Sequence, residues 1–190
     1  RAVVQRVSYT GDLGYEIYCD AMEQRHLWSV LSGHGAVFGA RPFGMRAMMS
    51  LRLDRFFGSW GREYSPDYTA AETGLDRFID FSKESEFIGR AAAEAEREVP
   101  PRRLLQAFEV DASDCDVVAD EPVWLDGAVR GFCTSGGYAH WSDMSIAMAF
   151  VPTERLSADL EVEIELLGER RPARLLTEAP FDPDGDRLRG

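Results

Sequence analysis

The chain has 190 residues, 45% of them hydrophobic and 28% charged, a composition typical of globular proteins and sufficient for one ordinary domain or two small ones. Its formal net charge of −12 leaves no basic surface to displace the counterions of DNA or RNA, so we exclude a nucleic-acid partner and expect a small-molecule one. No apolar run approaches the roughly 20 residues of a membrane-spanning helix, and we expect no membrane partner.

The cysteines and histidines point away from disulfide and metal chemistry. The three cysteines are odd in number and far apart, which argues against a disulfide framework and favours a reducing, cytoplasmic location: Cys19, Cys115 and Cys133. The three histidines show no metal-ligand spacing with one another or with a cysteine. We therefore expect no metal site.

The first segment predicts a hairpin and then a helix. Residues 2–9 and 14–19 form an antiparallel pair around Gly11-Asp12-Leu13-Gly14, whose glycines tolerate positive φ. Beyond the turn, the period of two places Glu16 on the face opposite its neighbours, either in solvent or in a site. Residues 21–33 predict an amphipathic helix ended by Gly33. Because the sequence starts within a strand pattern, without methionine or signal peptide, we expect a fragment of a longer protein.

The middle of the chain mixes helix and strand signals. Residues 45–54 predict a helix that continues into a short strand at 51–53, which would place Arg52 in a strand. Apolar alternation over residues 71–81 predicts another strand. The alanine- and glutamate-rich run after Arg90 predicts a helix stopped by Pro100-Pro101.

After the double proline the sequence changes to short β-type runs separated by Gly, Pro and Asp-Gly. Six such runs predict a closed or nearly closed antiparallel barrel: residues 104–110, 122–125, 128–133, 145–150, 160–167 and 170–176. We therefore predict an α+β chain with a mixed first domain at residues 1–102 and a β-barrel domain at residues 103–190. The turn-rich residues 181–190 predict a loose tail.

Taken singly, the candidate functional residues are ambiguous. The Gly-Asp-Leu-Gly turn lacks the glycine spacing of a phosphate-binding loop. Arg52 faces either water or a ligand anion, and Trp60 either stacks on a flat ring or belongs to the core. Thr134-Ser135 lacks the G-x-S-x-G elbow of a serine hydrolase, which argues against serine hydrolysis.

Three longer segments carry a resemblance: SYTGDLGYEIY, the stretch from GMRAMMSLRLD through GSWGREYSPDYTAAETGLDRFIDF to FIGRAAAEAE, and GFCTSGGYAHWSDMSIAMAFVP. In this order and spacing they closely resemble the tetrahydrofolate-dependent aminomethyltransferase family, founded on the T-protein of the glycine cleavage system. The W-G-R-E and S-P-D-Y-T segments are most similar to the branch fused behind a flavin domain in dimethylglycine and sarcosine dehydrogenases and oxidases. The resemblance covers nearly the whole chain but only the C-terminal part of the family's fold. It implies a partial folate-binding α/β domain followed by the barrel.

The resemblance also implies roles for four residues. Glu16 matches the second glutamate of Y-T-G-E-x-G-[FWY]-E, which binds the pterin ring; a carboxylate accepts two parallel N–H bonds from an aminopyrimidine edge. Tyr9 matches a tyrosine lining the same pocket. Arg52 matches the arginine of L-R-L-E, near the glutamate tail of folate. Trp60 stands where many T-proteins have tyrosine, as a further aromatic wall. The family's first glutamate is Asp12 here, a shorter side chain at a structural position in the turn.

For the intact protein the resemblance implies capture of a one-carbon unit from a methylated glycine or another aminomethyl donor, to form methylenetetrahydrofolate. The family's catalytic aspartate falls upstream of residue 1, so no catalytic residue is assigned here. The implied partners are a folate, an amine substrate and the missing N-terminal half. FAD is expected only if the parent carries an upstream flavin domain. The chain alone is expected to have little or no turnover.

Two other functions remain open at the level of sequence. One is a folate-dependent demethylase acting on a sulfonium such as dimethylsulfoniopropionate. The other is a non-catalytic folate-binding or assembly module. A G-x-G-x-x-G flavin fingerprint upstream would favour the oxidase branch.

Overall fold

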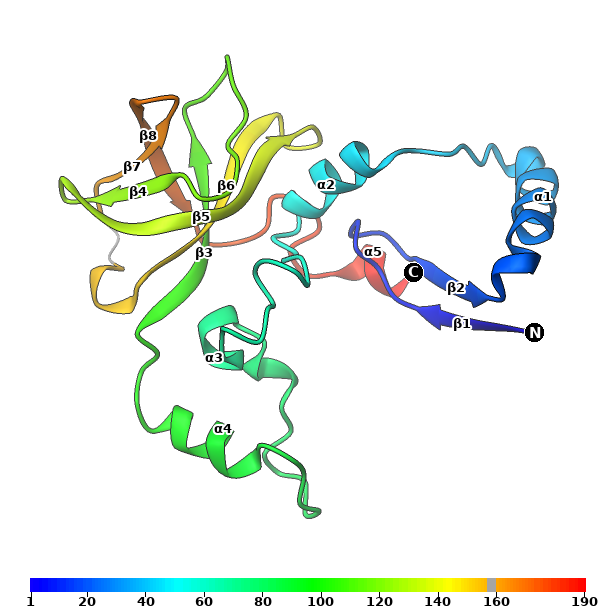
Figure 1. Ribbon diagram of the computed structural model, residues 1–190, viewed down its shortest axis with the longest axis horizontal. Coiled ribbons are helices and arrows are strands. Elements are labelled where there is room, and N and C mark those ends of the chain that lie inside the picture. Colours follow the sequence, from blue (N-terminus) through cyan, green and yellow to red (C-terminus); the bar gives the residue numbers. More distant parts are fainter. Residues whose placement is uncertain (157–159) are drawn as a thin grey trace.

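The computed structural model describes residues 1–156 and 160–190. The predicted hairpin is confirmed: β1 (Ala2–Arg6) pairs antiparallel with β2 (Tyr15–Cys19). Between the strands, Val7 N donates to Gly14 O at 3.2 Å, and Gly11 has φ +96°, a conformation that favours glycine. The predicted helix follows as a short 3-10 turn (Ala21–Glu23) and α1 (Gln24–Gly35). Figure 1 shows this hairpin and α1 extending away from the rest of the molecule.

A second helix, α2 (Met45–Leu53), follows a 3-10 turn at Ala36–Phe38 and an extended stretch. The prediction of a short strand at residues 51–53 is wrong, because the helix runs without a break to Leu53. Two leucines flanking Arg52 fit a strand and a helix equally well, and all three are good helix formers. Arg52 therefore lies at the end of a helix.

The predicted strand at residues 71–81 is also wrong. The structure has a single-turn helix α3 (Ala70–Thr73) and a 3-10 turn (Asp76–Phe78) there. Thr69 and Glu72 form a reciprocal capping box, and Gly74 ends the helix at φ +69°. These local start and stop signals outweigh the apolar alternation. The predicted alanine-rich helix is confirmed as α4 (Arg90–Arg97), which ends before Pro100.

The barrel is confirmed as a closed antiparallel sheet in the order β3-β6-β5-β4-β7-β8, so the α+β fold class is confirmed. Its strands are β3 (Arg103–Val110), β4 (Pro122–Leu125), β5 (Ala128–Ala139), β6 (Met144–Pro152), β7 (Val162–Leu166) and β8 (Glu169–Leu176). β5 extends six residues beyond its predicted end at residue 133. A Cβ on Gly136 would meet the Val117 side chain at 2.5 Å, so this glycine permits close packing within the strand.

Strand β6 is buried on both faces and joins the barrel to α2. Ala147, Ala149 and Val151 face the barrel core. Ile146 and Met148 alternate with them and pack against Leu53 of α2 on the other face. The end of α2 is thereby fixed on the outside of the barrel.

The C-terminal segment is not the loose tail that its composition predicted. Phe181 is buried, and its N–H donates to Asp54 O at 3.1 Å. Beyond it, α5 (Asp186–Arg189) lies beside the hairpin (Figure 1), where Arg187 Nε contacts Asp12 Oδ1 at 2.6 Å. The composition predicts a turn correctly, but the contact between Arg187 and Asp12 spans 175 residues and leaves no local pattern in the sequence. The segment thus ties the hairpin to the end of α2.

Within the described residues, no helix combines the length and the apolar character needed to cross a membrane.

Candidate functional site

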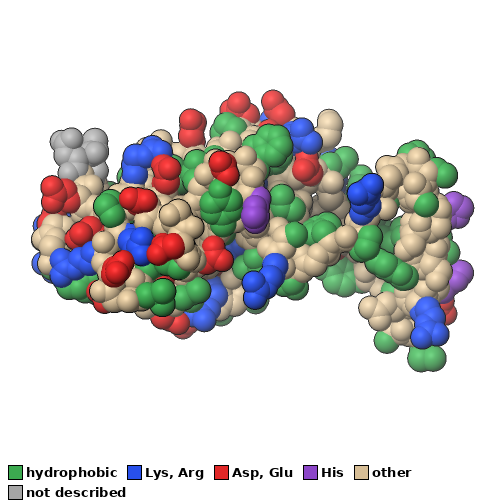
Figure 2. All heavy atoms as spheres, turned by 90° about the horizontal axis from the view of Figure 1, so that it is seen from above, with side chains coloured by type: hydrophobic (Ala, Val, Ile, Leu, Met, Phe, Trp, Pro, Cys, Tyr) green, Lys and Arg blue, Asp and Glu red, His purple; other side chains and the backbone are tan. Residues whose placement is uncertain are grey.

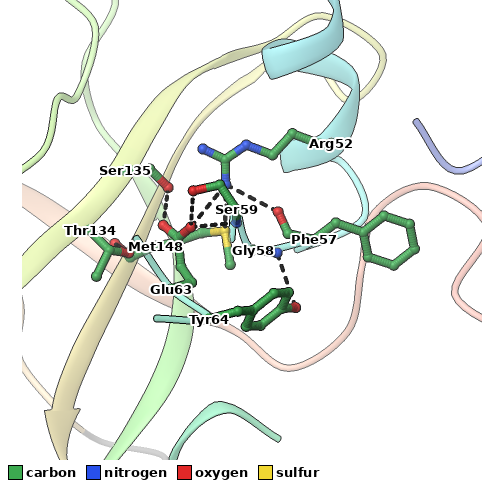
Figure 3. Close-up of polar contacts among 9 residues, drawn as sticks. All are labelled: Arg52, Phe57, Gly58, Ser59, Glu63, Tyr64, Thr134, Ser135 and Met148. Atoms are coloured by element: carbon green, nitrogen blue, oxygen red, sulfur yellow. Dashed lines mark hydrogen bonds and ion pairs between the residues drawn. The ribbon is translucent and has the colours of Figure 1, made fainter. Parts of the chain in front are cut away.

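The end of α2 carries a buried ion pair. Arg52 Nη1 lies 3.9 Å from Glu63 Oε2, and neither side chain is exposed to solvent. Figure 3 shows the two groups enclosed between α2, the turn that follows it and the barrel strands. Because burying two charges is costly, such a pair persists only where further hydrogen bonds satisfy its atoms.

Both carboxylate oxygens of Glu63 accept hydrogen bonds. Ser59 donates to Oε2 through its backbone N–H at 2.6 Å and through its hydroxyl at 3.0 Å, and the Ser135 hydroxyl donates to Oε1 at 2.5 Å. Burial alone would raise the pKa of the Glu63 carboxyl, but these hydrogen bonds and the charge of Arg52 outweigh it and hold the pKa below its usual value. Glu63 is therefore a carboxylate, and the Ser135 hydroxyl is bound to it.

The guanidinium of Arg52 has hydrogen-bond partners for only one of its three nitrogen atoms within the described chain. Its Nη1 atom donates to Phe57 O at 3.1 Å and contacts Met148 Sδ at 3.2 Å (Figure 3). Within the described chain, its Nε and Nη2 atoms are buried and have no hydrogen-bond partner. Unpaired buried donors are costly, so this edge of the guanidinium is an unused binding group.

Tyr9 lies beside this pair. The side chain is half-buried, and burial raises the pKa of its phenol above 10.0. The positive charge of Arg52 lowers the pKa of this phenol, whereas Glu63 and Tyr64 raise it further. Two of the four predicted site residues, Tyr9 and Arg52, are therefore coupled electrostatically.

Glu16 lies elsewhere, exposed on β2. One of its carboxylate oxygens accepts a hydrogen bond from the Tyr18 hydroxyl, which raises the pKa of that tyrosine. Among the residues the structure describes, no basic side chain forms an ion pair with Glu16. Its other oxygen and the adjoining aromatic ring are open, which suits the N–H edge of a flat heterocycle.

Trp60 is 79% exposed, in the turn after α2. It forms an aromatic surface next to Ser59 and close in sequence to Glu63, and within the described residues it makes no hydrogen bond or ring contact with Glu16. The four predicted residues thus occupy three places: the buried cluster, the hairpin and this turn.

Two buried carboxylates were missed by the sequence reasoning. Glu63 is the last residue of W-G-R-E. The sequence signal for it is Arg52, because an arginine buried between two leucines needs a carboxylate as counter-charge. Asp54 is 1% exposed and accepts from the Ser142 backbone N–H at 3.2 Å and hydroxyl at 2.6 Å. It fastens the end of α2 to the turn between β5 and β6.

The described residues contain no group of three or more His, Cys, Asp or Glu side chains arranged to hold a metal ion.

The described chain thus combines a β-hairpin, a helix end with a buried charge pair and a closed six-stranded antiparallel barrel, which is an α+β architecture. Residues 1–83 match the GCVT N-terminal domain, and residues 102–182 match the glycine cleavage T-protein C-terminal barrel domain. The chain therefore belongs to the glycine cleavage T-protein family.

Known relatives agree with this assignment. The chain is 36% identical to mitochondrial dimethylglycine dehydrogenase of Rattus norvegicus over 173 residues, which cover 91% of this chain and 20% of that protein. It is 31% identical to an aminomethyltransferase of Geobacillus sp. (strain WCH70), covering 95% of this chain and 49% of that protein. A crystal structure of glycine cleavage system aminomethyltransferase T from Bartonella henselae superposes with a TM-score of 0.82 at 25% identity, over 95% of this chain and 49% of that one. The chain thus spans about half the length of the aminomethyltransferases that it matches.

Proposed function

We propose that the chain is the C-terminal portion of a tetrahydrofolate-binding aminomethyltransferase, which takes a one-carbon unit from a methylated glycine of the dimethylglycine or sarcosine type, or from another aminomethyl donor. The observation that carries this proposal is the open carboxylate of Glu16 on the hairpin of a T-protein family domain. The similarity to dimethylglycine dehydrogenase supports the methylated glycine as donor.

In this proposal Glu16 holds the pterin. Its carboxylate accepts two N–H bonds from the aminopyrimidine edge, and the Tyr18 hydroxyl, which donates to one of its oxygens, keeps it oriented. Tyr9 and Trp60 provide aromatic surfaces for the pterin or the aminobenzoyl ring. Arg52 contributes positive charge, and its unpaired Nε and Nη2 edge has the geometry that binds a carboxylate.

Tetrahydrofolate supplies a nucleophilic amine that accepts the one-carbon unit. This chain would bind and orient it next to the donor, which raises the effective concentration of the reacting groups. We propose that the aspartate that activates this amine belongs to the remainder of the folate-binding domain, so the chain by itself would show little or no turnover.

The exposed apolar surface of the first domain supports a missing partner. No residue of α1 is buried, and Trp28 is 59%, Val37 83% and Phe38 88% exposed. Hydrophobic side chains lie on the surface of the lobe at the right of Figure 2, which contains α1. Several large apolar side chains exposed on one helix and the turn after it favour an interface there. We propose that the other half of the folate-binding domain covers it.

We further propose a division between the folate-binding part, residues 1–102, and the barrel domain, residues 103–190. The family matches end at residue 83 and resume at residue 102, and β3 starts at Arg103. Three free cysteines support the cytoplasm as location, although some of the relatives are mitochondrial. We propose FAD as a cofactor only if the full-length protein also carries a flavin domain.

The test is calorimetric titration of tetrahydrofolate into the chain mixed with the separately expressed first half of a T-protein from this family. We expect Glu16→Gln to weaken binding by about tenfold to a hundredfold, because it removes a charged acceptor. Glu98→Gln, an exposed glutamate beyond α4, is the matched control and should change nothing. Equal binding by both variants would refute the role of Glu16. In the full-length parent, turnover of dimethylsulfoniopropionate but not of dimethylglycine would favour the demethylase alternative.

A further inference from the structure

A cavity of about 460 Å³ lies between the end of α2, the 73–77 segment, β3 and the chain that leaves β8. Its volume is in the range of small-molecule sites. Phe57, Tyr64 and Met148 line it and also belong to the surroundings of the Arg52 pair, so the cavity adjoins that cluster from outside. Glu16 does not line it.

The charge of this cavity is unusual for the protein. Both ionised groups in its wall are arginines, Arg55 and Arg77, and no acidic side chain of the described chain lines it. The protein as a whole has a net charge of −12. Neither arginine forms an ion pair with a described residue. Arg77 is exposed, but Arg55 is half-buried, and the other half-buried arginines of the described chain, Arg90, Arg103 and Arg171, are all paired with a carboxylate. Two guanidinium groups without counter-ions on one cavity wall favour an anionic ligand.

Arg55 is held rigidly at the cavity. Its Nη1 atom donates to the backbone carbonyls of Phe181, at 2.8 Å, and Asp182. Its Nε atom is buried and has no partner within the described residues. A buried, positioned donor with no acceptor is incomplete until a ligand or water supplies one.

Arg77, in the 73–77 segment of the cavity wall, is held by two contacts. Its Nη1 atom donates to Gly74 O at 2.9 Å, and its guanidinium stacks over the Phe78 ring at 4.8 Å from the centroid. The remaining N–H groups are free to bind a ligand. Tyr64 lines the same cavity, and its hydroxyl accepts from Gly58 N at 3.1 Å and so retains its own proton to donate.

We propose that this cavity binds a small organic anion through one or two carboxylate groups, with Arg55 and Arg77 as the charged contacts and Phe57 and Tyr64 as the apolar wall. A guanidinium group binds a carboxylate through two parallel N–H bonds, and the aromatic rings shield that contact from water. The carboxylates have two possible sources: a free dicarboxylate, or the glutamyl tail of a folate whose ring is bound elsewhere. The proposal stands on the cavity and does not depend on pterin binding by Glu16.

The experiment is calorimetric titration of the chain at low salt with two probes, glutarate and p-aminobenzoylglutamate. We expect at least one probe to bind, and Arg77→Gln to weaken that binding by about tenfold. Arg97→Gln is the matched control, because Arg97 is equally exposed, stacks on Phe81 at 4.4 Å and lines a different cavity. Arg77 makes a single hydrogen bond to the backbone, so Arg77→Gln should keep the thermal unfolding temperature of the wild type. Arg55→Lys keeps the positive charge but loses the paired N–H groups of the guanidinium, and it should also weaken probe binding.

Binding of both probes would identify a free dicarboxylate as sufficient, and binding of p-aminobenzoylglutamate alone would identify the glutamyl tail. Glu16→Gln should leave both affinities unchanged, so failure of the pterin proposal is distinguishable from failure here. The absence of binding by both probes at millimolar concentration, or binding that Arg77→Gln and Arg97→Gln weaken equally, would overturn the proposal.

Discussion

Arg52 Nη1 lies 3.9 Å from Glu63 Oε2, and both side chains are completely buried between α2 and the barrel. Glu63 accepts three hydrogen bonds from Ser59 and Ser135, while Arg52 keeps two donors unused. The carboxylate is therefore the fully satisfied partner, and the arginine depends on it. Loss of Glu63 would leave a buried guanidinium with no counter-charge.

Glu63→Gln should lower the free energy of unfolding by about 3–5 kcal/mol, the usual consequence of removing one partner of a buried ion pair. Urea denaturation followed by circular dichroism measures it. The exposed pair Arg62–Asp120 supplies the control, because Asp120→Asn should have little effect at a solvated site. A loss in Glu63→Gln no larger than that in Asp120→Asn would contradict a stabilising role for the buried carboxylate.

The same carboxylate should make stability depend on pH. The pKa of Glu63 lies below its usual value of 4.5, so the unfolded chain binds the proton more readily than the folded one. Its contribution is complete above about pH 4.5 and is lost as the pH falls through the lower, folded pKa. Thermal unfolding measured from neutral to acid pH should show this loss in the wild type and a shallower decline in Glu63→Gln. Parallel declines would assign acid sensitivity to other groups.

Where a pattern repeats locally, the sequence was enough to predict the fold. The hairpin followed from two apolar runs around Gly11 and Gly14, α4 from its alanine content, and the barrel from six short alternating runs. Each of these elements is specified by neighbouring residues or by the two-residue alternation of a β-strand, and both can be recognised in the sequence.

The site was less predictable because its contacts are distant in sequence. Arg52 was assigned to a strand, and its partner Glu63 was not identified, because burial of a charged side chain follows from the way α2 packs on β6. The tail was misjudged because Phe181 and Arg187 act on residues more than a hundred positions away. Sequence patterns and residue propensities are local, so they do not predict contacts between residues so far apart in the sequence.

The hairpin turn should be sensitive to any added side chain at Gly11. A Cβ there would meet Arg55 Cγ at 2.6 Å and Phe181 Cδ1 at 3.0 Å, and the backbone has φ +96°. Gly39→Ala is the control, since Gly39 also has positive φ, +73°, but no atom within 4 Å of an added Cβ. Both variants carry the strain of the left-handed backbone.

We therefore expect Gly11→Ala to lower the free energy of unfolding by about 1–3 kcal/mol more than Gly39→Ala does, the usual effect of overpacking. Urea denaturation of the two variants and the wild type measures the difference. Equal losses would mean that the contacts of Arg55 and Phe181 with the turn contribute nothing, and that backbone strain alone sets the effect.

Cys133 should be inert in the folded protein. It lies in the barrel core with no exposed surface, and burial raises the pKa of its thiol to about 12. Since only the thiolate reacts with disulfide and alkylating reagents, the reactive fraction at neutral pH is negligible. Cys19, half-buried on β2, serves as the internal comparison. Iodoacetamide treatment of the native chain followed by peptide mass mapping should label Cys19 and leave Cys133 unmodified, whereas labelling in urea should modify both. Equal labelling of the two in the native chain would mean that the barrel opens at neutral pH far more readily than its closed sheet predicts.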